Sequence, residues 1–246
     1  MSARSVSSYT IADAIRAFDR PHMLVEIIAD ITCPWCFIGL KRLQRALALR
    51  PTYNPTFQWR PFLLNPDLHD GSVNRHHYLT RVFGSESRIQ QFQNAVDTAG
   101  IAVGIAFNFQ SADFTPSSIN AHRLISYASG QISPLIVAEM LFEAYFVDGK
   151  NIGTPEVLIS LASALGLAPD DTRVFLESDE GKQAVFDENT KIHRLGVNGV
   201  PAFVFGKRNI ISGAQEPQAL VNVLDFLSTA EQLEQNDEEN SHEAGP

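Results

Sequence analysis

Two cysteines, Cys33 and Cys36, are the residues of this chain whose type and spacing most directly indicate chemistry. They are the only cysteines among 246 residues, and Pro34 and Trp35 separate them. Two thiols cannot build the disulfide framework of a secreted protein, and a structural zinc site needs four ligands. No second cysteine pair exists, and the seven histidines show no cysteine-partnered spacing, so no metal is expected. The pair is therefore either a reactive dithiol or two incidental structural thiols.

The segments around the cysteines predict a strand followed by a helix. Residues 23–30 form a short, apolar, β-branched run that is typical of a buried strand. Pro34 suits the first position of a helix, and apolar residues at helical spacing follow as far as Pro51. Free N–H groups and the dipole at a helix N-terminus stabilise negative charge, so Cys33 is the predicted attacking thiolate. Cys36, one turn into the helix, then resolves the mixed disulfide.

A second informative segment lies far along the chain, at Val200–Pro201. The sequence GVNGVPAFVF places this proline at the head of a predicted strand over residues 201–206, a position at which a sheet tolerates proline. A cis peptide bond before Pro201 would turn the chain sharply and leave the Val200 backbone groups free to face the thiols. A trans proline that merely opens a strand is the alternative.

The remaining patterns place the strands at the two ends of the chain and helices between them. Three segments read as further strands: residues 56–64, 201–206 and 209–214. From about residue 65 to 187 the pattern is helical. Within this block one helix is predicted to end at Gly100, and residues 101–110 are predicted to be extended. This order predicts a four-stranded sheet with a helical block inserted between its two halves.

These motifs give the chain a family resemblance. It resembles the DsbA-like branch of the thioredoxin superfamily in CPWC after a strand, in GVNGVPAFVF and in the closing ISGAQEP, over about residues 22–228. Within that branch it is similar to the FrnE-like group, which also resembles 2-hydroxychromene-2-carboxylate isomerases and kappa-class glutathione transferases. The resemblance implies the fold class α/β, a thioredoxin-like fold with a large inserted all-helical domain.

The resemblance also implies a set of site residues. The expected site residues are catalytic Cys33 and Cys36 and substrate-binding Pro34, Trp35, Val200 and Pro201. Pro201 is implied to be a cis-proline, and Val200 to pair with a bound peptide or thiol. Trp35 either contacts substrate or simply covers the thiols. His122 falls in a predicted helix that could face the site, and a hydrogen-bonded structural histidine is the favoured interpretation.

The predicted domain organisation is discontinuous. It comprises an N-terminal extension (1–21), a thioredoxin-like domain (22–66 and 188–230), a helical insertion (67–187) and an acidic disordered tail (231–246). Of the net charge of −9, six negative charges come from the tail, which leaves −3 for the rest. Because no basic stripe is visible, nucleic acid is not an expected partner. A short amphipathic helix is predicted from Thr10 to Phe18.

The favoured function is a thiol–disulfide oxidoreductase acting on a thiol- or disulfide-containing protein or small molecule. No tightly bound cofactor is expected, and glutathione is a candidate co-substrate. The alternative is a glutathione-dependent isomerase or transferase for an aromatic or polyketide-like molecule. Its apolar pocket would use five phenylalanines that otherwise belong to the core: Phe92, Phe107, Phe109, Phe142 and Phe146. The isomerase and transferase relatives carry serine where Cys33 stands, which favours redox chemistry. A non-catalytic binding module is the third interpretation.

The location predicted from the sequence is the cytoplasm. No apolar run approaches the roughly 20 residues of a membrane span, so no membrane association is expected. The N-terminus lacks the continuous apolar core of a secretory signal. Its serines and arginines faintly resemble a mitochondrial transit peptide, against which Asp13 and Asp19 count. A homodimer is an open alternative, although no exposed apolar stripe identifies an interface.

Overall fold

The structure is a computed structural model that describes residues 23–111, 113–227 and 229. In chain order its elements are β1 (Leu24–Ala29), α2 (Pro34–Ala48), β2 (Thr56–Pro61), β3 (Ser72–Asn74), α3 (Arg75–Phe83), α4 (Glu86–Val103), β4 (Phe114–Pro116), α5 (Ile119–Ala128), α6 (Pro134–Phe146), α7 (Pro155–Ala164), α8 (Pro169–Glu177), α9 (Lys182–Arg194), β5 (Ala202–Phe205) and β6 (Asn209–Ser212). Residues 217–227 are also helical. The predicted Thr10–Phe18 helix and the acidic tail lie outside the described residues.

The main sheet contains four strands in the order β2–β1–β5–β6. Strand β1 pairs in parallel with β2 and antiparallel with β5, so that Ile27 lies between Trp59 and Phe203. Strands β5 and β6 lie within the segments predicted as strands at 201–206 and 209–214, and they form an antiparallel hairpin. Its turn contains Gly206 and Lys207 at φ of 58° and 66°. The strands therefore come from both ends of the described chain, as the order of the sequence patterns indicated.

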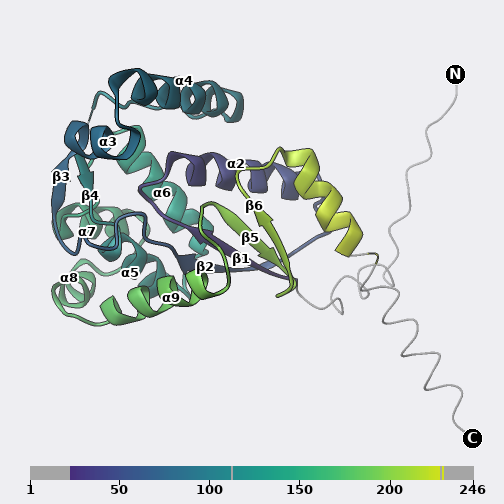
Figure 1. Cartoon of the computed structure of the whole chain (residues 1–246). Coiled ribbons are helices and arrows are strands. Elements are labelled where there is room, and N and C mark those ends of the chain that lie inside the picture. The colour runs from purple at the N-terminus through teal and green to yellow at the C-terminus, as the bar shows by residue number, and fades with distance from the viewer. Residues whose placement is uncertain (1–22, 112, 228, 230–246) are drawn as a thin grey trace, which may run out of the picture.

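Each face of this sheet carries its own core, because side chains alternate along a strand. Ile27 and Phe203 belong to the large core, which α2 and the helix at 217–227 cover. Ile28 and Val204 point to the opposite face and pack with Ile192 of α9 in a smaller core. The sheet is thus enclosed between helices, and the turn from β1 into α2 lies at one of its ends (Figure 1).

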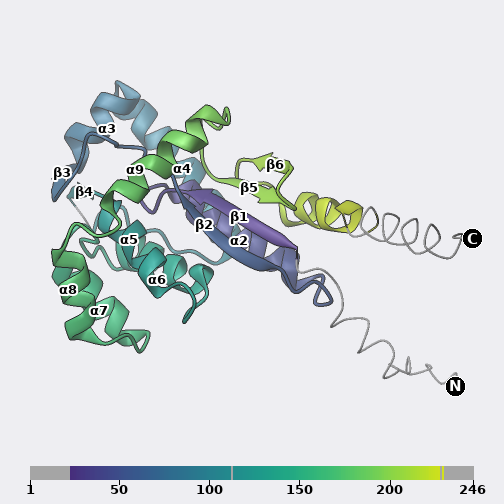
Figure 2. The same ribbon diagram turned by 90° about the horizontal axis from the view of Figure 1, so that it is seen from below.

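The elements from β3 to α9 gather at the end of the sheet at which α2 begins (Figures 1 and 2). Helices α4 and α6 pack directly against α2. The segment expected to be all-helical also contains a small antiparallel sheet of β3 and β4, in which Val73 lies opposite Thr115. These strands are too short for an alternating pattern to reveal them. Helix α9 continues through residues 187 and 188, where the sequence suggested a domain boundary. Every helix that the structure describes is too short or too polar to span a bilayer.

The predicted end of one helix is wrong. Helix α4 continues to Val103 and ends at Gly104, whose φ of 82° provides the left-handed cap. Gly100 lies inside the helix because a ring packs against it: a Cβ there would come within 2.5 Å of the Phe107 ring. Gly100 is therefore a close-packing glycine, and residues 101–103 are helical rather than extended.

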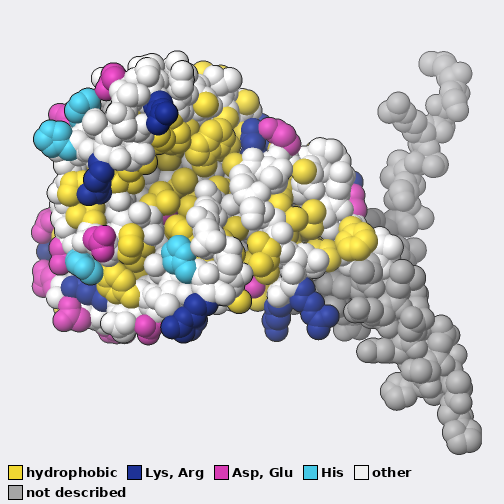
Figure 3. Space-filling view, viewed as in Figure 1, with side chains coloured by type: hydrophobic (Ala, Val, Ile, Leu, Met, Phe, Trp, Pro, Cys, Tyr) yellow, Lys and Arg dark blue, Asp and Glu magenta, His cyan; other side chains and the backbone are white. Residues whose placement is uncertain are grey.

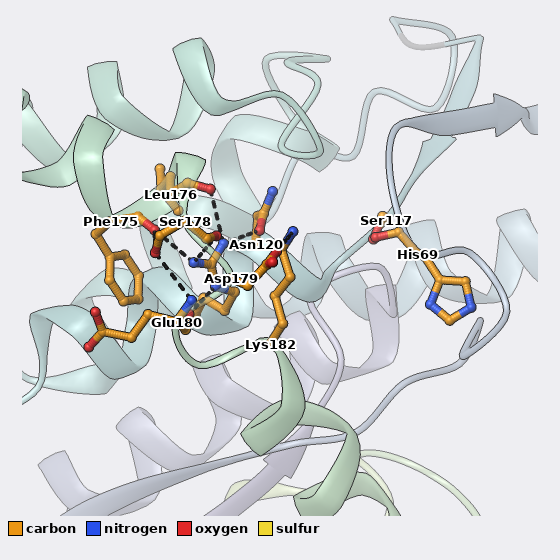
Figure 4. Close-up of polar contacts among 10 residues, drawn as sticks. His69, Ser117, Asn120, Phe175, Leu176, Ser178, Asp179, Glu180 and Lys182 are labelled. Atoms are coloured by element: carbon orange, nitrogen blue, oxygen red, sulfur yellow. Dashed lines mark hydrogen bonds and ion pairs between the residues drawn. The ribbon is translucent and has the colours of Figure 1, made fainter.

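Arg123 of α5 fixes helix α8 to the rest of the insertion. It is fully buried, and each of its five N–H groups donates a hydrogen bond of 2.6–3.1 Å. The acceptors, shown in Figure 4, are the backbone carbonyls of Phe175, Leu176, Ser178 and Glu180 and the side-chain oxygen of Asn120. These carbonyls lie at the end of α8, where a helix leaves its acceptors without internal partners. Arg123 has no donor left for a ligand, so its role is structural.

Candidate active site

Cys33 lies at the junction between β1 and α2, where it forms the N-cap of the helix. Its backbone is extended, with φ of −96° and ψ of 113°, and Pro34 occupies the first turn. The backbone N–H of Cys36 donates to the carbonyl of Cys33 at 3.0 Å, which closes this turn. A negative charge on the Cys33 sulfur would consequently lie at the positive end of the helix dipole.

The two thiols are free, and their surroundings differ. Cys33 is 7% exposed and Cys36 only 2%. Burial and the neighbouring Cys33 thiol raise the pKa of the Cys36 thiol well above its usual value. A backbone hydrogen bond with Asp30 lowers this pKa, and the charge on Asp30 raises it. Cys36 is therefore protonated at neutral pH and lies behind Cys33. This arrangement suits an attacking thiol that is the more accessible of the two and a resolving thiol that is more deeply buried.

The loop before β5 brings Val200 and Pro201 to the thiols. The peptide bond between them is cis, and the carbonyl oxygen of Val200 lies 3.9 Å from the Cys33 sulfur. The N–H of Gly213 donates to the Pro201 carbonyl at 2.7 Å and ties the loop to the chain beyond β6. A pocket of about 370 Å³ lies beside this loop and is lined by residues 195–201 and by β6. Residues predicted to act together thus lie together, although 167 positions separate Cys33 from Val200.

Gly39 of α2 allows the helix to approach this loop closely. A Cβ at Gly39 would lie 2.8 Å from Cγ of Pro201 and 3.3 Å from the Phe203 ring. We expect Gly39→Ala to push the loop away from Cys33 and to slow disulfide exchange. It should lower the free energy of unfolding by about 1 kcal/mol, because overpacking of about 1–3 kcal/mol exceeds the helix preference for alanine of about 1 kcal/mol. Denaturant unfolding and exchange rates measure both effects.

Gly199→Ala is the matched control for Gly39→Ala. Gly199 is exposed in the same loop, and a Cβ there would meet nothing within 4 Å. The stability and the disulfide-exchange rate of the Gly199→Ala variant should stay close to those of the wild type. Equal behaviour of the two variants would contradict the inferred contact between α2 and the loop.

The surface near the start of α2 is strongly apolar. Figure 3 shows hydrophobic side chains gathered in a hollow between α3 and α4 on one side and the start of α2 on the other. Trp35 is partly buried and packs against the large core. Of the phenylalanines considered for an apolar pocket, Phe142 and Phe146 are fully buried core residues. Phe107 and Phe109 are partly buried, and their rings stack with centroids 5.2 Å apart.

A buried polar cluster behind the thiols escaped the sequence analysis. Asp30 is fully buried, and its carboxylate accepts the N–H of Thr32 at 2.9 Å and the N–H of Leu64 at 2.7 Å. Its Oδ1 lies 3.8 Å from Nε2 of His122, and Nδ1 of that ring accepts a hydrogen bond from Nε1 of Trp59 at 3.0 Å. One signal could have revealed Asp30: it is an acid at the end of an apolar strand, directly before the cysteine turn.

The cluster keeps Asp30 charged. Burial alone raises the pKa of Asp30, but His122 and the N–H groups of Thr32 and Leu64 outweigh burial and hold the pKa below its ordinary value. Among the described residues, no group of three or more His, Cys, Asp or Glu side chains is arranged to hold a metal ion. The groups that this site offers for chemistry are two thiols and a buried carboxylate.

Comparisons with known sequences agree with this arrangement. A family model described as a DsbA-like thioredoxin domain matches residues 24–225. An uncharacterised protein of Bacillus subtilis, YwbO, is 23% identical over 196 residues, which cover 77% of this chain and 90% of that protein. The family match includes the cysteine turn and the loop before β5.

Solved structures extend the comparison. A probable DsbA oxidoreductase from Streptomyces coelicolor is similar with a TM-score of 0.73 and 28% identity, covering 82% of this chain and 88% of its own. The cytosolic disulfide reductase DsbM from Pseudomonas aeruginosa, in a structure with GSH, has a TM-score of 0.60 and 16% identity. This similarity covers 84% of this chain and 99% of DsbM. A 2-hydroxychromene-2-carboxylate isomerase has a TM-score of 0.59 and 17% identity. This similarity covers 90% of this chain and 100% of the isomerase. The last two similarities concern the fold.

Proposed function

Because the chain belongs to the family of DsbA-like thioredoxin domains, we propose that it is a thiol–disulfide oxidoreductase with Cys33-Pro34-Trp35-Cys36 as its active site. The family match confirms the predicted resemblance and the predicted α/β, thioredoxin-like fold. One observation supports the assignment of the site most strongly. Cys33 caps α2 beside the Val200 carbonyl, and the buried Cys36 lies behind it.

The proposed reaction proceeds through a mixed disulfide. The Cys33 thiolate attacks one sulfur of a substrate disulfide, and that bond breaks as a bond between Cys33 and the substrate forms. The other substrate sulfur leaves as a thiolate and takes up a proton. Cys36 then loses its proton and attacks the Cys33 sulfur, which releases the second substrate thiol and forms the Cys33–Cys36 disulfide. Two electrons have passed from the protein to the substrate.

The same steps in reverse oxidise a substrate dithiol, and the reduction potential of the pair decides which direction prevails. In a reducing cytoplasm, two molecules of a small thiol such as glutathione would restore the dithiol and become a disulfide themselves. We therefore assign glutathione the role of co-substrate. Pro34, Trp35, Val200 and Pro201 form the proposed surface that receives the substrate, which is a protein or a small molecule.

A single-turnover experiment tests the proposal. Reduced protein is mixed with oxidised glutathione, quenched with acid at intervals and analysed by intact mass. The expected sequence is a transient glutathione adduct followed by loss of the two thiol hydrogens as the internal disulfide forms. A protein that forms neither product would contradict the proposal.

The alternative, a glutathione-dependent isomerase or transferase, predicts a different result of the same experiment. A persistent glutathione adduct without an internal disulfide would favour it, because that chemistry needs bound glutathione and no resolving thiol. Two observations speak for the oxidoreductase. A cysteine stands at position 33, where the isomerase and transferase relatives carry serine, and Cys36 stands within reach of it. Two of the phenylalanines that the alternative would use are core residues.

A further inference from the structure

We propose that His122 is a positioning residue for the resolving thiol: it holds the Asp30 carboxylate in its charged form next to Cys36. This inference rests on the proposed oxidoreductase function. The cluster joins three parts of the fold, because Asp30 follows β1, Trp59 lies on β2 and His122 lies on α5 of the insertion. The side chains of His122 and Asp30 are 0% and 1% exposed, so water screens their interaction little.

The hydrogen bond from Trp59 fixes the tautomer of His122. Indole Nε1 can only donate, so Nδ1 of His122 must be the acceptor of this 3.0 Å contact. A hydrogen on Nδ1 would set two donors against each other. The network thus places the N–H of His122 at Nε2.

The Asp30 carboxylate lies close to this N–H. Nε2 is buried without a hydrogen-bond partner among the described residues, and the Oδ1 of Asp30 lies 3.8 Å away. The separation exceeds that of a direct hydrogen bond, so the attraction acts across a short gap between the N–H dipole and the carboxylate. A buried, unscreened dipole in this position favours the charged carboxylate.

The carboxylate in turn acts on the resolving thiol. The titratable groups that interact with Asp30 are His122 of α5, Cys36 of α2 and Tyr78 of α3. Burial and Cys33 raise the pKa of Cys36 most, a backbone hydrogen bond with Asp30 lowers it, and the charge on the Asp30 carboxylate raises it. The charge on Asp30 therefore adds to the burial that keeps Cys36 protonated between turnovers, so that an external disulfide reacts with Cys33 first. His122 thereby contributes to the order of the two steps.

Two substitutions of His122 separate this role from a packing role. His122→Gln keeps an N–H that can reach Asp30, whereas His122→Leu fills similar space without a donor. In reduced protein, the carboxyl carbon resonance of Asp30 is followed by NMR as a function of pH. We expect His122→Leu to raise the midpoint of this titration by at least about one pH unit, and His122→Gln to leave it near the wild-type value. A two-bond proton–nitrogen spectrum of the wild type should show the hydrogen of His122 on Nε2.

A further variant measures the effect of the Asp30 charge on the Cys36 thiol. In a Cys33→Ser background, in which Cys36 is the remaining thiol, Asp30→Asn should speed the alkylation of Cys36 by iodoacetamide at pH 8 by about fivefold or more. An unchanged Asp30 midpoint in His122→Leu, or equal shifts in His122→Leu and His122→Gln, would overturn the role of His122. The NMR titrations and the alkylation experiment do not need turnover. A failed turnover assay would therefore refute the proposed function, whereas the role of His122 would still be tested by these measurements.

Discussion

Replacing Cys33 with serine is expected to abolish disulfide exchange, lowering the rate by about a thousandfold or more. The hydroxyl of serine is not ionised at neutral pH and cannot form the mixed disulfide. Serine is also among the best N-cap residues, and Cys33 is the N-cap of α2, so the helix should remain intact. The rate is measured with a mixed disulfide of glutathione and a model peptide as substrate. An unchanged melting temperature shows that the variant is folded.

Cys36→Ser is the partner variant in this experiment. It should still attack the substrate through Cys33, but the mixed disulfide should accumulate, because the resolving thiol is missing. Intact mass then shows a covalent adduct in Cys36→Ser and none in Cys33→Ser. Turnover that survives in Cys33→Ser, or an adduct formed at Cys36 in that variant, would contradict the assigned roles.

The second large effect is expected on stability, at Arg123. Arg123→Lys should lower the free energy of unfolding by about 3 kcal/mol or more, and the melting temperature by about 6–12 °C. Lysine keeps the charge, but its three donors cannot replace a planar fork that satisfies five acceptors. The carbonyls of Leu176 and Ser178 would then lose the partner that Arg123 provides, whereas the Phe175 carbonyl keeps the Ser178 hydroxyl. Denaturant unfolding and calorimetry measure the loss.

Arg173→Lys, on α8 itself, provides the control for Arg123→Lys. The Arg173 side chain is 47% exposed, and its ion pair with Glu177 is 3.9 Å long. Such a surface pair contributes about 0–0.5 kcal/mol, so this variant should melt within about 2 °C of the wild type. If both lysine variants melted alike, the structural role assigned to Arg123 would be wrong.

The parts of the fold that follow from local patterns could be predicted from the sequence. Strand β1, helix α2 and the β5–β6 hairpin lie where apolar periodicity, Pro34 and the turn residues placed them. Gly100 shows the limit of this approach. The helix continues past it to Val103, and the packing of Phe107 against position 100 explains why a glycine stands inside the helix there.

The candidate site likewise could be predicted from the sequence where motifs mark it, but not where it depends on tertiary packing. The thiols and the Val200–Pro201 loop carry recognisable motifs, so their meeting could be expected. The Asp30 cluster carries none, because it depends on tertiary packing: 63 positions separate Trp59 from His122. A lone histidine in a helix gives no indication of its partner. The favoured interpretation of His122 as a hydrogen-bonded, structural histidine agrees with its contact from Trp59, and its proximity to Asp30 could not be foreseen.

The reduction potential of the Cys33–Cys36 pair tests the central claim of a redox-active dithiol most directly. The protein is equilibrated in buffers of reduced and oxidised glutathione, and the fraction of internal disulfide is measured by mass after alkylation. We predict a single two-electron transition between about −270 and −120 mV, the range of thioredoxin-fold oxidoreductases. A pair that forms no internal disulfide at any buffer ratio, or one whose potential lies below about −300 mV as in structural disulfides, would contradict the claim.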